Sequence, residues 1–218
     1  MTRPPLTSRS RAARDALAAV ILEAFERPDA IGLLDDLTAV LVGAGTVPAR
    51  GRAARLASSV ALVQVGEAGA LLPAAGVAPG PLVERLRCAR QALATDRTRP
   101  RPFPGALGVA AVLLAAGLFF EVHEVLEREW QTLTGERRRF YQGVIQLVVA
   151  LHHLVHENAG SAVRLFASAR EKLGPLEPAF EGVDTSVLLA GSAAWDQAAR
   201  AGAGWPEALP LPELRPAP

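Results

Sequence analysis

The longest uninterrupted apolar stretch of the chain runs from Gly105 to Phe120, between Pro104 and Glu121. Its 16 residues fall short of the roughly 20 that a membrane-spanning helix needs. The stretch therefore predicts a helix of a folded domain and no membrane span. Because 50% of the residues are hydrophobic and 21% are charged, the chain can build a core and is not expected to be disordered.

The cysteine content and the N-terminus indicate the cytoplasm. Cys88 is the only cysteine, so neither an intramolecular disulfide nor a cysteine-rich metal site can form. The apolar residues after the N-terminal arginines are interrupted by Glu23 and Glu26, which is unlike a signal peptide. We therefore expect a cytoplasmic protein without a membrane partner.

The second half of the chain shows helical periodicity with short connections. Thr134-Gly135 and residues 158–160 separate the first three segments, and Gly174-Pro175 ends the third. Short connections favour antiparallel neighbours, so we predict an all-α antiparallel bundle of about four helices. The predicted helices run from 105 through Trp130, from Glu136 to His156, from a cap at Ser161 to Leu173, and from a cap at Asp184 or Thr185 to Arg200.

The first half is also mostly helical by its apolar spacing. A first helix is predicted over 10–27, a second over 30–42 with Asp29 as its cap, and a third from near Pro48. Residues 60–72 fit either the end of a helix or a short hairpin. Another helix is predicted over 82–95.

Three prolines, at 100, 102 and 104, lie in the charged segment 96–104. Proline disrupts a helix, and charges keep a segment solvated, so this segment is the predicted linker. The domains are thus expected at 1–95 and 105–200, followed by a proline-rich extended tail at 201–218.

The basic residues are almost all arginines, since Lys172 is the only lysine. Residues 1–101 carry 14 arginines against 9 acidic residues. Such an excess can attract polyanions, and the arginines at 50, 52 and 55 would open the third helix. Nucleic-acid binding by this half is therefore one open alternative, although the excess is small for such a domain.

The segment from Phe119 to Glu127 mixes charged and aromatic residues on one helix. At 100° per residue, the same face carries two carboxylates and an imidazole beside aromatic rings, where a surface helix normally separates these types. Glu121 falls on another side. The residues that share the mixed face are Phe119, Phe120, His123, Glu124, Leu126, Glu127 and Trp130.

The following helix is apolar over most of its circumference and is therefore expected to be central. Gln142, Gln146 and His153 lie opposite its apolar face, with His152 at the edge. Buried amides and imidazoles need hydrogen-bond partners. His153 and His156 could also pair near the end of this helix.

In combination, these segments resemble domain-of-unknown-function family 309, which comprises small helical proteins of bacteria and archaea. The likeness covers about residues 105–200. It rests on Phe119–Glu127, Trp130, Gly135-Glu136-Arg137, Gln142-Gly143-Val144-Ile145-Gln146, Ala150-Leu151-His152, Asn158 and Gly182-Val183-Asp184. The resemblance implies an all-α fold and no established activity.

Two interpretations of the polar residues remain open. In the first, a buried network of His, Glu and Gln fixes the helices of a non-enzymatic domain that binds a protein or small-molecule partner. The candidate residues for this cluster are Glu121, His123, Glu124, Glu127, Trp130, Gln142, Gln146 and His152.

In the second interpretation, His123, Glu124 and Glu127 bind a divalent transition metal and serve a hydrolase-like enzyme. A carboxylate-rich site suits iron or manganese. The duplicated Glu-x-x-His pairs of di-iron bundles are missing from the sequence, however. Metal-free acid–base catalysis is a further option, although no nucleophile or phosphate-binding loop accompanies the residues.

Overall fold

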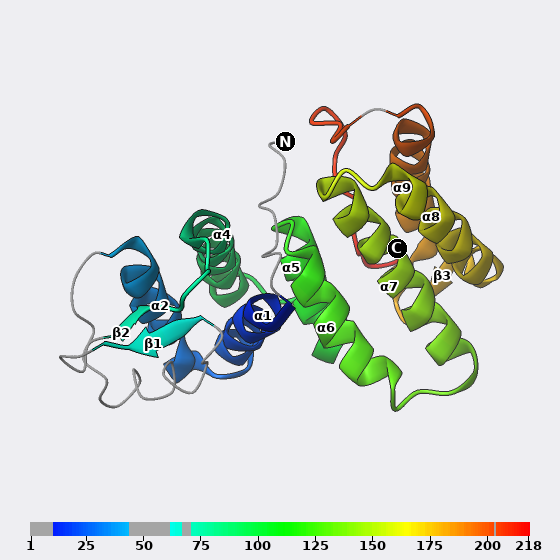
Figure 1. Ribbon diagram of the computed structural model, residues 1–218. Helices are drawn as coiled ribbons and strands as arrows, with labels where there is room; N and C mark the ends of the chain where they lie inside the picture. Colours follow the sequence, from blue (N-terminus) through cyan, green and yellow to red (C-terminus); the bar gives the residue numbers. More distant parts are fainter. Residues whose placement is uncertain (1–10, 44–61, 67–70, 203) are drawn as a thin grey trace. The chain divides into compact units, whose positions relative to one another are not determined.

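The computed structural model in Figure 1 describes residues 11–43, 62–66, 71–202 and 204–218. These residues form two compact units that divide between residues 94 and 95. Their only sheets are two short antiparallel hairpins, which confirms the all-α class. No helix in the described ranges is both long and apolar enough to cross a membrane.

The first unit combines helices with one hairpin. Its core contains Leu17 and Ile21 from the first helix and Leu37 from the second, all completely buried. Its elements are α1 (Arg11–Glu26), the 3-10 turn η1 (Pro28–Ala30), α2 (Ile31–Val42), β1 (Val63–Val65), β2 (Leu71–Pro73) and most of α4 (Pro79–Thr98).

Two predictions for this unit need comment. Of the alternatives for residues 60–72, the hairpin is right, because β1 pairs antiparallel with β2. Asp29 does not cap α2; the N-cap is Ala30, and the Asp29 carboxylate instead pairs with Arg27 at 2.9 Å. The helix predicted near Pro48, with the arginines at 50, 52 and 55, lies outside the described residues.

Helix α4 continues through Thr98, so the first residues of the segment predicted as a linker are helical. Proline fixes its own φ angle and disfavours the helical conformation of the residue before it. Pro100 therefore disrupts the helix from about Arg99 onward, and the residues before Arg99 remain helical. Asp96 also pairs with Arg101 at 2.6 Å.

The second unit is built from consecutive helices that pack in chain order: α5 on α6, α6 on α7, α7 on α8 and α8 on α9. Its elements are α5 (Gly105–Ala115), α6 (Phe119–Trp130), α7 (Gly135–Val155), α8 (Ala159–Leu173), η2 (Gly174–Leu176), β3 (Ala179–Phe180), β4 (Val183–Asp184) and α9 (Thr185–Arg200).

The single helix predicted from 105 through Trp130 is two helices. Gly117 has a φ of +72°, which glycine adopts without the strain of a side chain. Its N–H donates to Leu114, and the N–H of Leu118 donates to Leu113. This bonding pattern is the Schellman ending of a helix, and the chain therefore turns before α6 begins.

The predicted helix ends elsewhere are close to those observed, but one cap differs. Asn158, not Ser161, caps α8: its side chain accepts a hydrogen bond from the Ser161 N–H at 3.1 Å. Asp184 caps α9 by accepting from the Val187 N–H. Both are residues whose short polar side chains reach the exposed N–H groups of a helix start.

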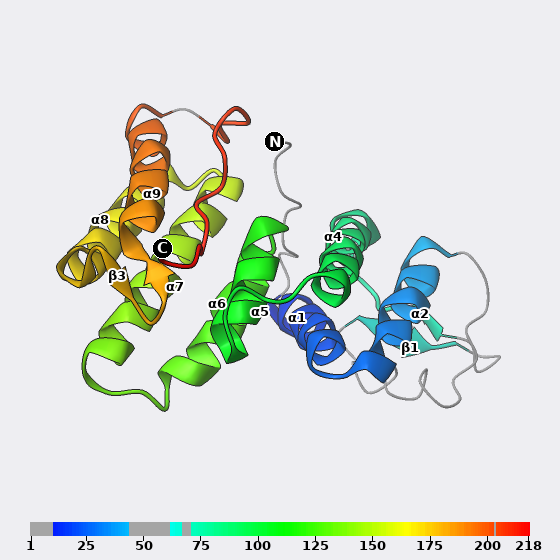
Figure 2. The ribbon, with the colours of Figure 1, turned by 180° about the vertical axis from the view of Figure 1, so that it is seen from behind.

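The proline-rich tail is tied to the second unit. Trp195 Nε1 donates to the carbonyl of Pro210 at 2.8 Å, and the Asp184 N–H donates to the carbonyl of Arg215 at 2.9 Å. Figure 2 shows the tail returning along α9 toward the hairpin of β3 and β4.

Gly143 sets how closely α7 and α8 approach. A Cβ atom added there would lie 2.7 Å from Cγ of Leu173, a side chain that is completely buried.

Overpacking of this kind costs about 1–3 kcal/mol, so Gly143→Ala should lower the free energy of unfolding by that amount in urea titrations. Gly160→Ala is the matched control, because its nearest neighbour is 3.9 Å away. Equal stability of the two variants would contradict the close approach.

Tyr141, the only tyrosine, is buried in α7. Burial, together with the carboxylates of Glu129 and Glu181, raises its pKa from 10.0 to about 12, against the opposing charge of Arg137. The neutral phenol therefore stabilises the fold fully below pH 10, and this stabilisation is lost as the pH rises through about 12.

The raised pKa of Tyr141 is tested in a pH titration that follows tyrosinate absorbance, while circular dichroism reports whether the helices remain folded. We expect ionisation near pH 12 in the folded protein and near pH 10 in urea. Ionisation near pH 10 with the helices intact would show that Tyr141 is exposed.

Candidate metal-binding cluster on helix α6

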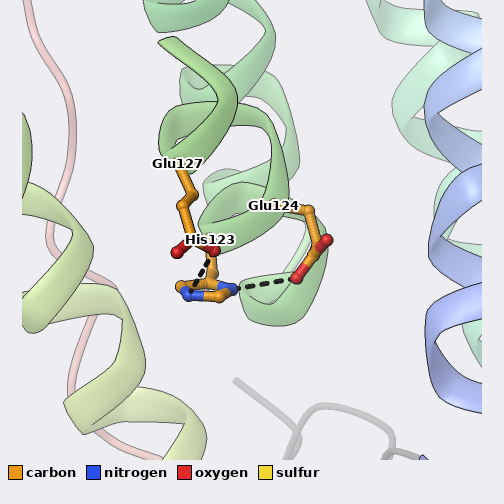
Figure 3. A group of neighbouring side chains, drawn as sticks. All are labelled: His123, Glu124 and Glu127. Carbon is orange, nitrogen blue, oxygen red and sulfur yellow. Dashed lines mark hydrogen bonds and ion pairs between the residues drawn. The ribbon is translucent and has the colours of Figure 1, made fainter. Parts of the chain in front are cut away.

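Three of the predicted residues meet on one face of α6. His123 lies between two carboxylates: its Nδ1 is 3.1 Å from Oε1 of Glu124, and its Nε2 is 3.3 Å from Oε2 of Glu127. Figure 3 shows the imidazole with one carboxylate at each nitrogen. The spacing explains the contact with Glu127, because residues four apart on a helix are neighbours, whereas Glu124 is adjacent to His123 in the sequence and reaches it through its side-chain conformation.

The cluster lies at the surface. The side chains of His123, Glu124 and Glu127 are 27%, 33% and 40% exposed. The expected contacts of His123 with the two carboxylates are present, but the three side chains are only partly buried. Phe120 covers one side of the imidazole, with ring centres 6.0 Å apart.

The remaining candidates from α6 lie elsewhere. Glu121 is completely buried, in the first turn of α6, where the helix dipole favours a carboxylate. The Trp130 ring is covered by the guanidinium of Arg138 at 3.7 Å, and Arg138 also donates to the carbonyls of Trp130 and Leu133. Trp130 thus packs on the turn between α6 and α7 through a contact that the sequence analysis missed.

The two glutamines of α7 do not complete the cluster. Among the described residues, no hydrogen bond joins Gln142 or Gln146 to His123 or its carboxylates. Gln142 is half-buried, and Oε1 of Gln146 is buried without a hydrogen-bond partner in the described part of the chain. The predicted bridge by Gln142 is therefore absent there.

His152 comes closer to the cluster, through Phe120. The rings of Phe120 and His152 are 6.1 Å apart, so this phenylalanine lies against one histidine of each helix. His153 differs, since burial and then the charge of Arg164 lower its pKa below the ordinary value of 6.5.

A polar pairing between α8 and α9, with a buried carboxylate and half-exposed arginines, is one that sequence analysis missed. Asp196 of α9 is buried and binds Arg170 of α8 at 2.6 Å and Arg200 at 3.1 Å. The spacing of Asp196 and Arg200 along one helix is visible in the sequence. The pairing with Arg170 is not, because it depends on how α8 and α9 pack.

The α6 cluster has the chemistry of a partial metal site. Two ligands of one transition-metal ion, each bound at about 2.0–2.1 Å, lie about 3.0–3.4 Å apart, and His123 Nε2 and Glu127 Oε2 are separated by 3.3 Å. A metal-bound histidine commonly donates its other N–H to a carboxylate, which is the position of Glu124. The candidate ligand atoms of the three residues lie within 4.8 Å of one another.

Fold and cluster together define an all-α domain with a histidine–carboxylate cluster at its surface. Residues 108–165 match the family described as "Domain of unknown function (DUF309)". The match confirms the family resemblance over this range, which includes α6 and α7. No solved structure gives a significant match.

A curated relative covers part of the chain. It is the uncharacterized protein YpuF of Bacillus subtilis (strain 168), which is 39% identical over 74 residues. The match covers 33% of this chain and 42% of the relative's own length. Neither comparison supplies an activity, so the role of the cluster has to be argued from its geometry.

The stability effect of the cluster should be small. Exposed ion pairs contribute about 0–1 kcal/mol, so His123→Gln should lower the free energy of unfolding by no more than about 1 kcal/mol. Asp196→Asn is the contrasting variant: its carboxylate is buried but its arginine partners are about half exposed, so its loss should cost about 1–2 kcal/mol, toward the lower part of the range for a buried charge-assisted hydrogen bond. Urea unfolding of both measures the difference, and a larger loss for His123→Gln would instead support a structural network.

Proposed function

We propose that residues 105–200 form a non-enzymatic binding domain whose small ligand is a divalent transition-metal ion at the α6 cluster. The observation that carries the proposal is the position of His123, which has one carboxylate at each ring nitrogen. In this proposal His123 Nε2 and Glu127 bind the ion, and Glu124 orients the imidazole.

Exposure supports binding over a purely structural role. The three side chains are between about a quarter and two fifths exposed, so an ion can reach them from solvent. Surface contacts of this kind add little stability. A role in stabilising the helical core therefore does not account for the cluster.

The ligand set favours manganese or iron. The His123 imidazole and the two oxygens of the Glu127 carboxylate offer one nitrogen and two oxygen donors, which suits these ions. Their preferred coordination numbers exceed what His123 and Glu127 supply. Water or a partner group would fill the remaining positions, so a bound ion could join the domain to a protein or small-molecule partner.

A metal-dependent, hydrolase-like enzyme is the second candidate. The same small number of protein ligands favours it, because catalytic metal sites keep positions open for water and substrate. We infer a cytoplasmic location for both candidates, because a chain with one cysteine cannot form an intramolecular disulfide, as is typical of that compartment.

Manganese binding tests the proposal. Protein purified without an affinity tag is titrated with Mn²⁺, and bound ion is measured by electron paramagnetic resonance and calorimetry. We expect one ion per chain, with affinity reduced at least about tenfold in His123→Gln and Glu127→Gln, and about tenfold in Glu124→Gln through loss of the orienting carboxylate.

Glu129→Gln is the matched control, since it removes a carboxylate from the same helix outside the cluster. It should leave Mn²⁺ affinity unchanged. Equal affinity of wild type and Glu127→Gln would overturn the proposal. Hydrolysis of model esters or phosphoesters that depends on Mn²⁺ and is lost in Glu127→Gln would favour the enzyme.

A further inference from the structure

The last turn of α7 and its C-cap residue, His156, hold three of the four histidines of the chain. His152 and His156 lie four residues apart, and their ring centres are 4.6 Å apart. His153 lies between them in sequence, with its ring centre 6.3 Å from that of His152. The closest pair is therefore His152 with His156, and not the pair of His153 with His156 considered from the sequence.

The distance between the two rings fits one shared ion. With metal–nitrogen bonds of about 2.1 Å, two imidazoles on one ion have ring centres about 4.6 Å apart at a right angle and about 5.3 Å apart at a tetrahedral angle. The observed distance of 4.6 Å matches the right angle, which is the angle in square-planar and tetragonal complexes.

The surroundings favour a cation at this pair. Phe120 packs against His152 and limits its rotation, while His156 is exposed and open to solvent. The pair lies at the C-terminal end of α7, where the carbonyl groups give the helix dipole its negative end. His153 is less suited, because Arg164 places a positive charge near it.

We infer that His152 and His156 form a second transition-metal site, specific for ions that prefer nitrogen ligands in tetragonal geometry, such as Cu²⁺ and Ni²⁺. The site is independent of the cluster on α6. Its two imidazole ligands favour Cu²⁺ and Ni²⁺, whereas the oxygen-rich cluster on α6 suits manganese or iron; Cu²⁺ at the two sites is told apart by the number of coordinating imidazole nitrogens.

Copper titration of the full chain, purified without an affinity tag, tests the inference. Cu²⁺ is added in the absence of other metals, and electron paramagnetic resonance reports nitrogen coordination. We expect a tetragonal spectrum with coupling to two imidazole nitrogens. His156→Gln and His152→Gln should each lower Cu²⁺ affinity at least about tenfold.

His153→Gln is the matched control, because it removes a histidine from the same turn and leaves the pair intact. His123→Gln separates this site from the α6 cluster. Both should keep a copper spectrum with coupling to two imidazole nitrogens. His156 is exposed, so its variant should keep the fold, which circular dichroism checks.

Two results would overturn the inference: unchanged Cu²⁺ affinity in the double variant His152→Gln/His156→Gln, or loss of the copper spectrum in His153→Gln. Loss of the spectrum in His123→Gln would also overturn it, by assigning the copper to α6. Failure of the manganese experiment leaves these outcomes untouched, since it concerns Glu127 and a different ion.

Discussion

The burial of α7 is the constraint on which the second unit depends. Completely buried side chains of this helix include Phe140, Val144, Leu147 and Leu151, and the helix packs on α6, α8 and α9. The approach to α8 is so close that Gly143 has no space for a side chain. Among the polar groups of its neighbours, Asp196 is buried against two arginines, Glu121 is buried in the first turn of α6, and the α6 cluster is only partly buried.

The polar groups of this unit therefore fall into two kinds. Asp196 is buried and binds two arginines, which satisfies a charge that would be costly to bury alone. His123, Glu124 and Glu127 make similar contacts at the surface, where water competes with each of them. Similar pairs of side chains thus connect α8 with α9 at Asp196, and at the α6 cluster they leave groups accessible to a ligand.

Much of the fold could be predicted from the sequence. Apolar periodicity located the helices of residues 135–200 closely, because burial of one helix face imposes that period. The break at Gly117 was missed, since an apolar run looks the same whether one helix or two bury it. For the cluster, spacing brought His123, Glu124 and Glu127 together correctly but did not reveal their exposure.

The sequence by itself determined the all-α class and the contacts between residues three or four apart, because helix geometry fixes those neighbours. This is why the contact of His123 with Glu127 was visible before the structure. Only the tertiary structure decided which side chains lie in the core, because burial depends on the helix that packs opposite. It separated Glu121 and Trp130 from the cluster, brought Phe120 against His152, and paired Asp196 with Arg170.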